Sequence, residues 1–160
     1  MAEQKSHRLP TTVIPERYQL RLTPDLKTWT FTGDETVKLQ IHQPVREIVL
    51  NAAELEIQSV TLTDGSGKVQ SASVTCDSEN EQARFAFITD VVAGVGELNI
   101  QFTGVLNDKL HGFYRSTYKG ADGQDKPLAS TQFESTDARR AFPCWDEPAL
   151  KAVYQVTLVV

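Results

Sequence analysis

Ser130 to Pro148 reads S-T-Q-F-E-S-T-D-A-R-R-A-F-P-C-W-D-E-P, and the interpretation of the whole chain starts from this stretch. It is too irregular to form one strand or one helix. Its charged residues, six in all, stand beside three large aromatic ones, Phe133, Phe142 and Trp145. Because burying a lone charge is costly, charges among aromatic rings are usually paired. We therefore predict a loop wedged against a sheet, with one helical turn around 137–141 and one end presenting side chains to a site.

The charged residues of this loop are predicted to form a structural cluster. Arginine presents a planar fork that binds carboxylates through two parallel hydrogen bonds, so ion pairing within the loop is the favoured interpretation. Direct contact with a substrate is the alternative. The members of the predicted cluster are Asp137, Arg139, Arg140, Asp146 and Glu147.

Outside this loop, short stretches of alternating apolar and polar residues recur along the chain, as in 17–22 and 98–103. Alternation with a period of two is typical of half-buried strands. Glycine, proline and aspartate separate these stretches, and no long amphipathic helix is visible. The sequence therefore predicts an all-β, mostly antiparallel sandwich with little helix.

Three local predictions follow from the turn residues and the loops. Gly33-Asp34 is expected to mark a bulge or turn inside the apolar pattern of 29–41. Asp64 to Gly67 is expected to form a hairpin turn, with Val69 to Cys76 as one returning strand. The acidic segment from Glu79 to Glu81 is expected to be an ordinary solvated loop.

The domain organisation is predicted to be simple. A length of 160 residues suits one domain with an adequate core. Residues 1–12 are polar and are expected to be a flexible lead, followed by a β-domain over 13–160. The alternation of 154–160 runs to the final residue without a stop signal, so we expect this domain to be truncated at its C-terminal end.

Charge and hydropathy exclude some classes of protein. The net charge is −5, the pI is near 5.2 and lysine and arginine do not cluster, which disfavours nucleic acid or an anionic membrane surface as a partner. No apolar run is long enough to span a bilayer, and the first residues lack the apolar core of a signal peptide. A cytoplasmic location is therefore expected. Cys76 and Cys144 have no metal-ligand spacing and are expected to be free thiols, although one disulfide is arithmetically possible.

The loop resembles a motif of the M1 family of zinc aminopeptidases, of the puromycin-sensitive type. That motif reads T-Q-F-E-P-T-D-A-R-R-A-F-P-C-W-D-E-P, and this chain differs from it at Ser135. Other segments also resemble family members: Pro15–Leu20, Phe31–Gly33, Leu50–Ala52 and Gly112–Ser116. The resemblance implies a saddle-like N-terminal β-domain that caps the active-site cleft of a larger enzyme.

The resemblance also implies a role for two residues. In the family, the residues matching Gln132 and Glu134 project into the active site, and the glutamate helps to bind the free α-amino group of a peptide substrate. That amine has a pKa of roughly 8, so it is mostly cationic at neutral pH. In a strand, both side chains would lie on one face with Phe133 on the other. The alternative is that Glu134 pairs with a neighbouring arginine, Arg139 or Arg140.

The metal centre is expected to lie outside this chain. A zinc peptidase of this family needs H-E-x-x-H, in which two histidines on one helix face bind the metal. His7, His42 and His111 lack that spacing, and the family's G-A-M-E-N motif is absent as well. We therefore expect no metal site and no peptidase activity in this chain alone, with the zinc-bearing catalytic domain as its partner. The alternatives are a free-standing β-sandwich binding module and a family member that has lost catalysis.

Two further features each allow two structures. The motif's proline would favour a cis bond before it, whereas Ser135 allows either a trans bond or a strained cis one. Tyr114, Arg115 and Tyr118 either line the mouth of a site or belong to a packed strand, and the packed strand is favoured.

Overall fold

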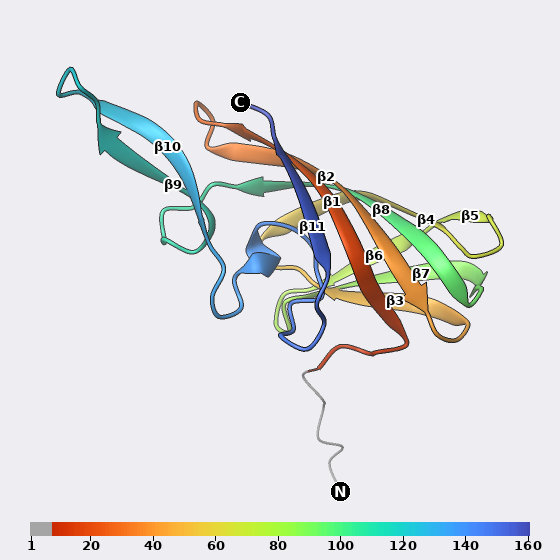
Figure 1. The fold of residues 1–160 in the computed structure, drawn as a ribbon. Coiled ribbons are helices and arrows are strands. Elements are labelled where there is room, and N and C mark those ends of the chain that lie inside the picture. Colours follow the sequence, from red (N-terminus) through yellow and green to blue (C-terminus); the bar gives the residue numbers. More distant parts are fainter. Residues whose placement is uncertain (1–7) are drawn as a thin grey trace, which may run out of the picture.

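The computed structural model describes residues 8–160, which form eleven strands and one 3-10 turn (Figure 1). Of the predicted lead over 1–12, residues 1–7 lie outside the described part, whereas Leu9 is buried against the core. The elements in chain order are β1 (Val13–Asp25), β2 (Thr30–Ile41), β3 (Val45–Asn51), β4 (Leu55–Thr63), β5 (Val69–Ser71), β6 (Ser73–Asp77), β7 (Gln82–Val91), β8 (Gly94–Val105), β9 (Gly112–Lys119), β10 (Asp125–Gln132), η1 (Ala138–Arg140) and β11 (Val153–Leu158).

The largest layer is a six-stranded sheet with the strand order β11-β1-β2-β8-β4-β5. Its neighbours are antiparallel except for β11, which lies parallel to β1. Tyr18, Leu20 and Leu22 face inward and are buried, while Gln19 and Arg21 between them are exposed. The alternation in the sequence thus predicted the strand and the direction of its side chains.

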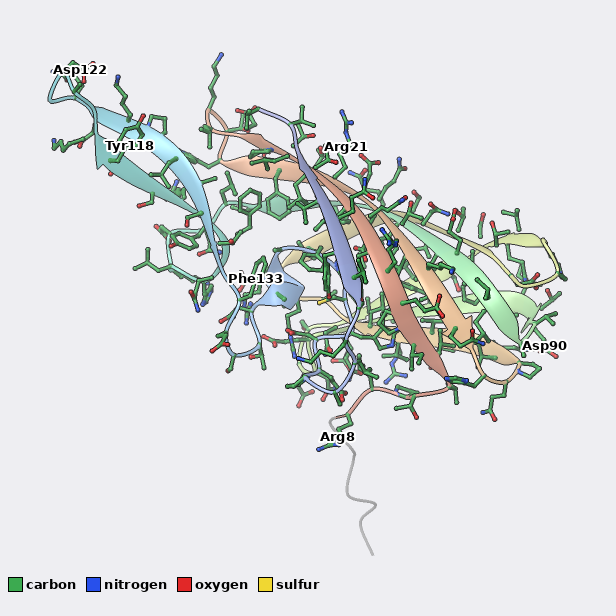
Figure 2. All side chains as sticks on the ribbon, viewed as in Figure 1. Arg8, Arg21, Asp90, Tyr118, Asp122 and Phe133 are labelled. Carbon is green, nitrogen blue, oxygen red and sulfur yellow. The ribbon has the colours of Figure 1, made fainter. Side chains whose placement is uncertain are left out.

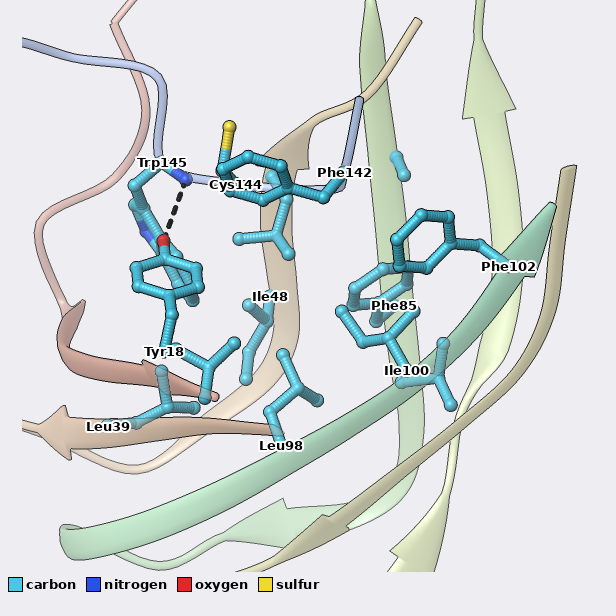
Figure 3. Packing of buried hydrophobic residues seen from close by; sticks show 14 of the residues in the cluster. Tyr18, Leu39, Ile48, Phe85, Leu98, Ile100, Phe102, Phe142, Cys144 and Trp145 are labelled. Carbon is cyan, nitrogen blue, oxygen red and sulfur yellow. Dashed lines mark hydrogen bonds between the residues drawn. The ribbon is translucent and has the colours of Figure 1, made fainter. Parts of the chain in front are cut away.

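A second, antiparallel sheet with the order β3-β7-β6 packs against the first. Ile48 and Phe85 from this sheet point toward Leu98 and Ile100 of β8, and all four side chains are buried (Figure 3). The apolar core therefore lies between two layers of strands. The all-β prediction is confirmed, and the expected helical turn is η1. The saddle-like shape stays a prediction.

The predicted bulge or turn at Gly33-Asp34 is wrong. Strand β2 continues through both residues, and its register with β1 and β8 does not shift there. A side chain at residue 33 would place its Cβ 2.1 Å from Cζ of Phe102. Glycine is used here because the Phe102 ring lies directly over the backbone, which requires close approach rather than a break in the strand.

The predicted single strand from Val69 to Cys76 is also wrong. It divides at Ala72 into β5, which pairs with β4 in the large sheet, and β6, which pairs with β7 in the small one. The N–H of Ala72 donates to the carbonyl of Val60 at 3.0 Å. The hairpin turn that precedes this strand is as predicted, with Gly67 at a φ of 84° and its N–H bonded to the carbonyl of Asp64.

Strands β9 and β10 form a separate hairpin, here called the arm, which projects from the two-layered body (Figure 1). Tyr118 and Asp122 lie at its outer end, away from the body (Figure 2). At its base, Gly112 has a φ of 66°, and a Cβ there would lie 2.7 Å from Cβ of Arg140. The arm therefore joins the body at the loop that the sequence singled out.

Candidate functional site

The loop 133–148 leaves the end of β10 and runs back across the body (Figure 1). It is tied to β3 by two backbone hydrogen bonds between Asn51 and Cys144, of 2.8 and 3.0 Å. It is tied to β1 because the backbone N–H of Trp145 donates to the hydroxyl of Tyr18 at 3.2 Å (Figure 3). The predicted loop wedged against a sheet is confirmed, and it contacts strands of both layers.

Arg139 is held on two sides by carboxylates. Its Nε lies 2.9 Å from Oδ2 of Asp146, and its Nη1 lies 3.2 Å from Oε2 of Glu81. Only 13% of the arginine side chain is exposed. Its backbone carbonyl also accepts a hydrogen bond of 2.9 Å from the N–H of Ala53. The side chain therefore fixes the loop rather than being offered to a ligand.

Arg140 makes three carboxylate contacts. Its Nε lies 2.9 Å from Asp137 and its Nη1 lies 2.9 Å from Glu54, while Nη2 contacts Glu81. Burial alone would lower the pKa of Arg140, but the hydrogen bond that it donates to Asp137 and the charges of Glu81 and Glu54 raise this pKa above its usual value. The guanidinium is therefore charged at any ordinary pH, and the predicted pairing of both arginines is confirmed.

Glu81 is the residue on which the two arginines converge, and the sequence analysis missed it. Its assignment to an ordinary solvated loop is wrong, because its side chain contacts both Arg139 and Arg140. Glu54 was missed in the same way. Both glutamates have positive φ, 58° at Glu54 and 52° at Glu81. No local pattern signals these contacts, since the partners lie 58 to 86 positions apart in the chain.

The prediction that Glu147 pairs with the arginines of the loop is wrong. Its Oε1 accepts a hydrogen bond of 2.5 Å from the backbone N–H of Leu9, and it makes no ion pair within residues 8–160. The carboxylate thus fixes the chain just before β1 to the end of the loop. The correction has a simple cause, because Glu54 and Glu81 already occupy the remaining sides of the arginines.

Gln132 and Glu134 are both exposed, whereas Phe133 between them is partly buried against the core. Glu134 makes no ion pair with Arg139, Arg140 or any other residue of the described part, so the predicted alternative of arginine pairing is not what the structure shows. Gln132 contacts it only weakly, with Nε2 3.5 Å from the Glu134 carbonyl oxygen. Strand β10 ends at Gln132, and the Glu134–Ser135 peptide bond is cis.

A pocket of about 600 Å³ opens beside the same loop. Its lining is polar and mixed in charge, and Gln132 and Glu134 are not part of it. The lining residues are Arg8, Asn51, Asp77, Asn80, Gln82, Arg84, Thr136, Arg139, Asp146, Glu147, Pro148 and Ala149. The exposed carboxylate of Glu134 therefore lies outside this pocket.

Three ionisable groups are buried near one another under the loop. Both carboxylate oxygens of Glu35, on β2, lack a hydrogen-bond partner in the described residues, and burial raises the pKa of Glu35 well above its usual range. Burial also raises the pKa of Tyr18 and of Cys144, with a contribution from Glu35 to each. Burial thus favours the neutral form of each group, which is the less nucleophilic form. Cys76 and Cys144 are free thiols, as predicted.

Within residues 8–160, no group of three His, Cys, Asp or Glu side chains is placed to hold a metal ion. Nδ1 of His111 lies 3.9 Å from Asp137 at the base of the arm. Arg115 is paired with Asp108 and lies 5.7 Å from the ring centre of Trp29, so the packed alternative is supported for Arg115, whereas Tyr118 is exposed on the arm.

Comparison with known proteins identifies the family. Residues 14–160 match the Peptidase M1 N-terminal domain. The chain is 48% identical over 157 residues to Aminopeptidase M1 of Arabidopsis thaliana, covering 96% of this chain and 18% of that protein. It is 42% identical over 160 residues to the puromycin-sensitive aminopeptidase of Caenorhabditis elegans, covering 99% and 17%. Aminopeptidase 2, mitochondrial, of Saccharomyces cerevisiae is 41% identical over 156 residues, covering 94% and 16%.

The chain belongs to the M1 aminopeptidase family and corresponds to its N-terminal domain, as the loop motif predicted. It spans less than a fifth of the length of these relatives, at 16 to 18%. Among residues 8–160, no helix is long and apolar enough to cross a membrane.

Proposed function

We propose that this domain serves a zinc aminopeptidase that removes N-terminal residues from peptides, and that it caps the active-site cleft. The observation that supports this most directly is the environment of Glu134. Its carboxylate is exposed and has no ion-pair partner within residues 8–160, whereas the charges of Arg139, Arg140, Asp137 and Asp146 in the same loop are paired. A carboxylate kept free in this way is suited to bind a cation that comes from elsewhere.

The proposed ligand of Glu134 is the α-ammonium group of the peptide substrate. An endopeptidase substrate has no charge at the corresponding position, so a fixed carboxylate would select peptide ends. Gln132, next to it on the exposed side, would add amide donors and acceptors. The pocket of about 600 Å³ does not include these residues, and in this proposal the catalytic domain would supply the remaining walls of their site.

Zinc would be bound by the catalytic domain. His111 contacts a single carboxylate, that of Asp137, and no three His, Cys, Asp or Glu side chains within residues 8–160 are placed to hold a metal ion, so the described residues do not fit zinc. The domain by itself is therefore proposed to have no peptidase activity and no measurable affinity for a peptide amine, since an exposed carboxylate in water contributes about 1 kcal/mol at most.

The proposal is tested by Glu134→Ala in the full-length enzyme. Losing one partner of a desolvated charge pair costs about 2–5 kcal/mol, which corresponds to a fall in kcat/KM of about 30- to 5,000-fold on aminoacyl substrates. Glu56→Ala is the matched control, because Glu56 is an exposed glutamate on β4. A Glu134→Ala enzyme with nearly unchanged kcat/KM would rule out the proposed role.

A further inference from the structure

Phe133 separates the two exposed residues of the proposed amine site, and its ring turns the other way. It packs against the core at the point where the arm meets the body (Figure 2). Its ring centre lies 6.0 Å from that of Phe142, with the rings inclined at 76°. This edge-to-face geometry is a favourable contact between aromatic rings.

Phe142 in turn is held from the large sheet. Its ring lies 6.1 Å from Tyr18 of β1 at 70°, and 6.1 Å from Tyr154 of β11 at 68°. The two tyrosine rings are stacked, with centres 4.6 Å apart and an angle of 7°. Phe142 is only 4% exposed, and Tyr18 is fully buried. The four rings, here called the aromatic cluster, connect the rigid sheet to residue 133.

The backbone around Phe133 is also fixed from this side. The carbonyl of Phe133 accepts a hydrogen bond of 2.9 Å from the N–H of Asp137, which closes the turn that contains Glu134. By contrast, within residues 8–160 the Glu134 side chain makes no hydrogen bond or ion pair, and the Gln132 side chain makes only the 3.5 Å contact from its Nε2 to the backbone carbonyl oxygen of Glu134. What orients these two residues is therefore the anchored residue between them.

We propose that Phe133 is a positioning residue for Glu134, acting through its contact with Phe142. This inference rests on the proposed amine-binding role of Glu134 and adds a residue that does not touch the substrate. A displacement of a binding group by about 1 Å can lower a rate by about 100-fold. Truncating the ring at residue 133 is therefore expected to impair the enzyme through Glu134.

The test is a double-mutant cycle in the full-length enzyme, with Phe133→Ala, Glu134→Ala and the double variant assayed on an aminoacyl substrate. Phe133→Ala is expected to lower kcat/KM by about 10- to 100-fold, and by less than about 3-fold when Glu134 is already alanine. Equal losses in both backgrounds would show that Phe133 acts independently of Glu134, and the proposal would be wrong.

Phe87→Ala is the matched control, because Phe87 is a buried phenylalanine on β7 that takes no part in the aromatic cluster. It is expected to lower the Tm at least as much as Phe133→Ala, yet to keep kcat/KM within about 3-fold below that Tm. A similar loss of kcat/KM in Phe87→Ala and Phe133→Ala would show that the effect comes from a general loss of core packing, and the proposal would be wrong.

The cycle also separates the two proposals. If Glu134→Ala alone has no effect, the amine-binding role fails and the positioning role fails with it. If Glu134→Ala is impaired but the two changes are additive, only the positioning role fails. Should Phe133→Ala not accumulate as folded enzyme, Phe133→Leu removes the ring but retains an apolar contact, and it enters the same cycle under the same criterion.

Discussion

The arginines of the loop and the carboxyl group of Glu35 are both withdrawn from water, but within residues 8–160 only the arginines have partners. Arg139 and Arg140 are shared among Asp137, Asp146, Glu54 and Glu81 at the edge of the body. Glu35 is 2% exposed, and both of its oxygens lack hydrogen-bond partners in the described residues. The comparison indicates that the paired charges hold the loop in place, whereas the unpartnered carboxyl group of Glu35 lowers the free energy of unfolding.

The largest effect is expected from Arg140→Ala. This change leaves three carboxylates close together without their shared cation, so the free energy of unfolding should fall by about 2–3 kcal/mol, somewhat below the cost of breaking a fully buried pair. The measurement is urea unfolding of the chain at low salt, followed by tryptophan fluorescence. The free energy of unfolding of Arg140→Lys should lie between those of wild type and Arg140→Ala, because lysine restores the positive charge but not the planar guanidinium group. If Arg140→Ala unfolds with the wild-type midpoint, the cluster does not stabilise the loop.

Glu35→Leu should stabilise the protein by about 1–3 kcal/mol at pH 7, because it replaces an unpaired polar group with an apolar one of similar volume. The pKa of Glu35 is raised in the folded state, so above about pH 4.5 the unfolded chain loses this proton first. Wild-type stability should therefore fall as pH rises from there toward the folded-state pKa.

The Glu35→Leu variant lacks this titration, so its advantage over wild type should be larger at pH 7 than at pH 4. Urea unfolding of both proteins at the two pH values measures the difference. A constant advantage across this range would mean that the carboxyl group finds a partner or water on ionisation.

Arg46→Ala should have the smallest effect. Arg46 contacts Asp90 through Nε, but the side chains are 68% and 61% exposed. Exposed ion pairs contribute little to stability because water and salt screen them. The expected result is an unchanged urea midpoint, and a clear loss would show that exposure is a poor guide to which of this protein's ion pairs matter.

Much of this site could be predicted from the sequence because its signals are local. The loop motif specifies the two arginines and their near neighbours Asp137 and Asp146, and alternation along strands such as 17–22 gives their buried faces. The assignment to the M1 family followed from the same motif and is confirmed. The cytoplasmic location, the extent of the domain and the roles of Gln132 and Glu134 stay predictions.

The rest depends on contacts between distant segments. Glu54 and Glu81 reach the arginines only because β3, β7 and the loop meet in space. The burial of Glu35 was readable in principle, since the inward period of β2 that includes Val37 also includes residue 35. The burial of Glu35 was not predicted because polar residues are normally assigned to the outer face of a strand.

The division of a strand at Ala72 has a mechanical consequence. Since β5 and β6 are separated by that one residue but belong to different layers, the layers cannot slide past each other without pulling β5 from β4 or β6 from β7. The loop 133–148 is attached to β1 in one layer and β3 in the other. The continuous chain from β5 through Ala72 to β6 therefore opposes lateral displacement of the two layers that hold the loop. As a result, the orientation of the loop is tied to that of the body.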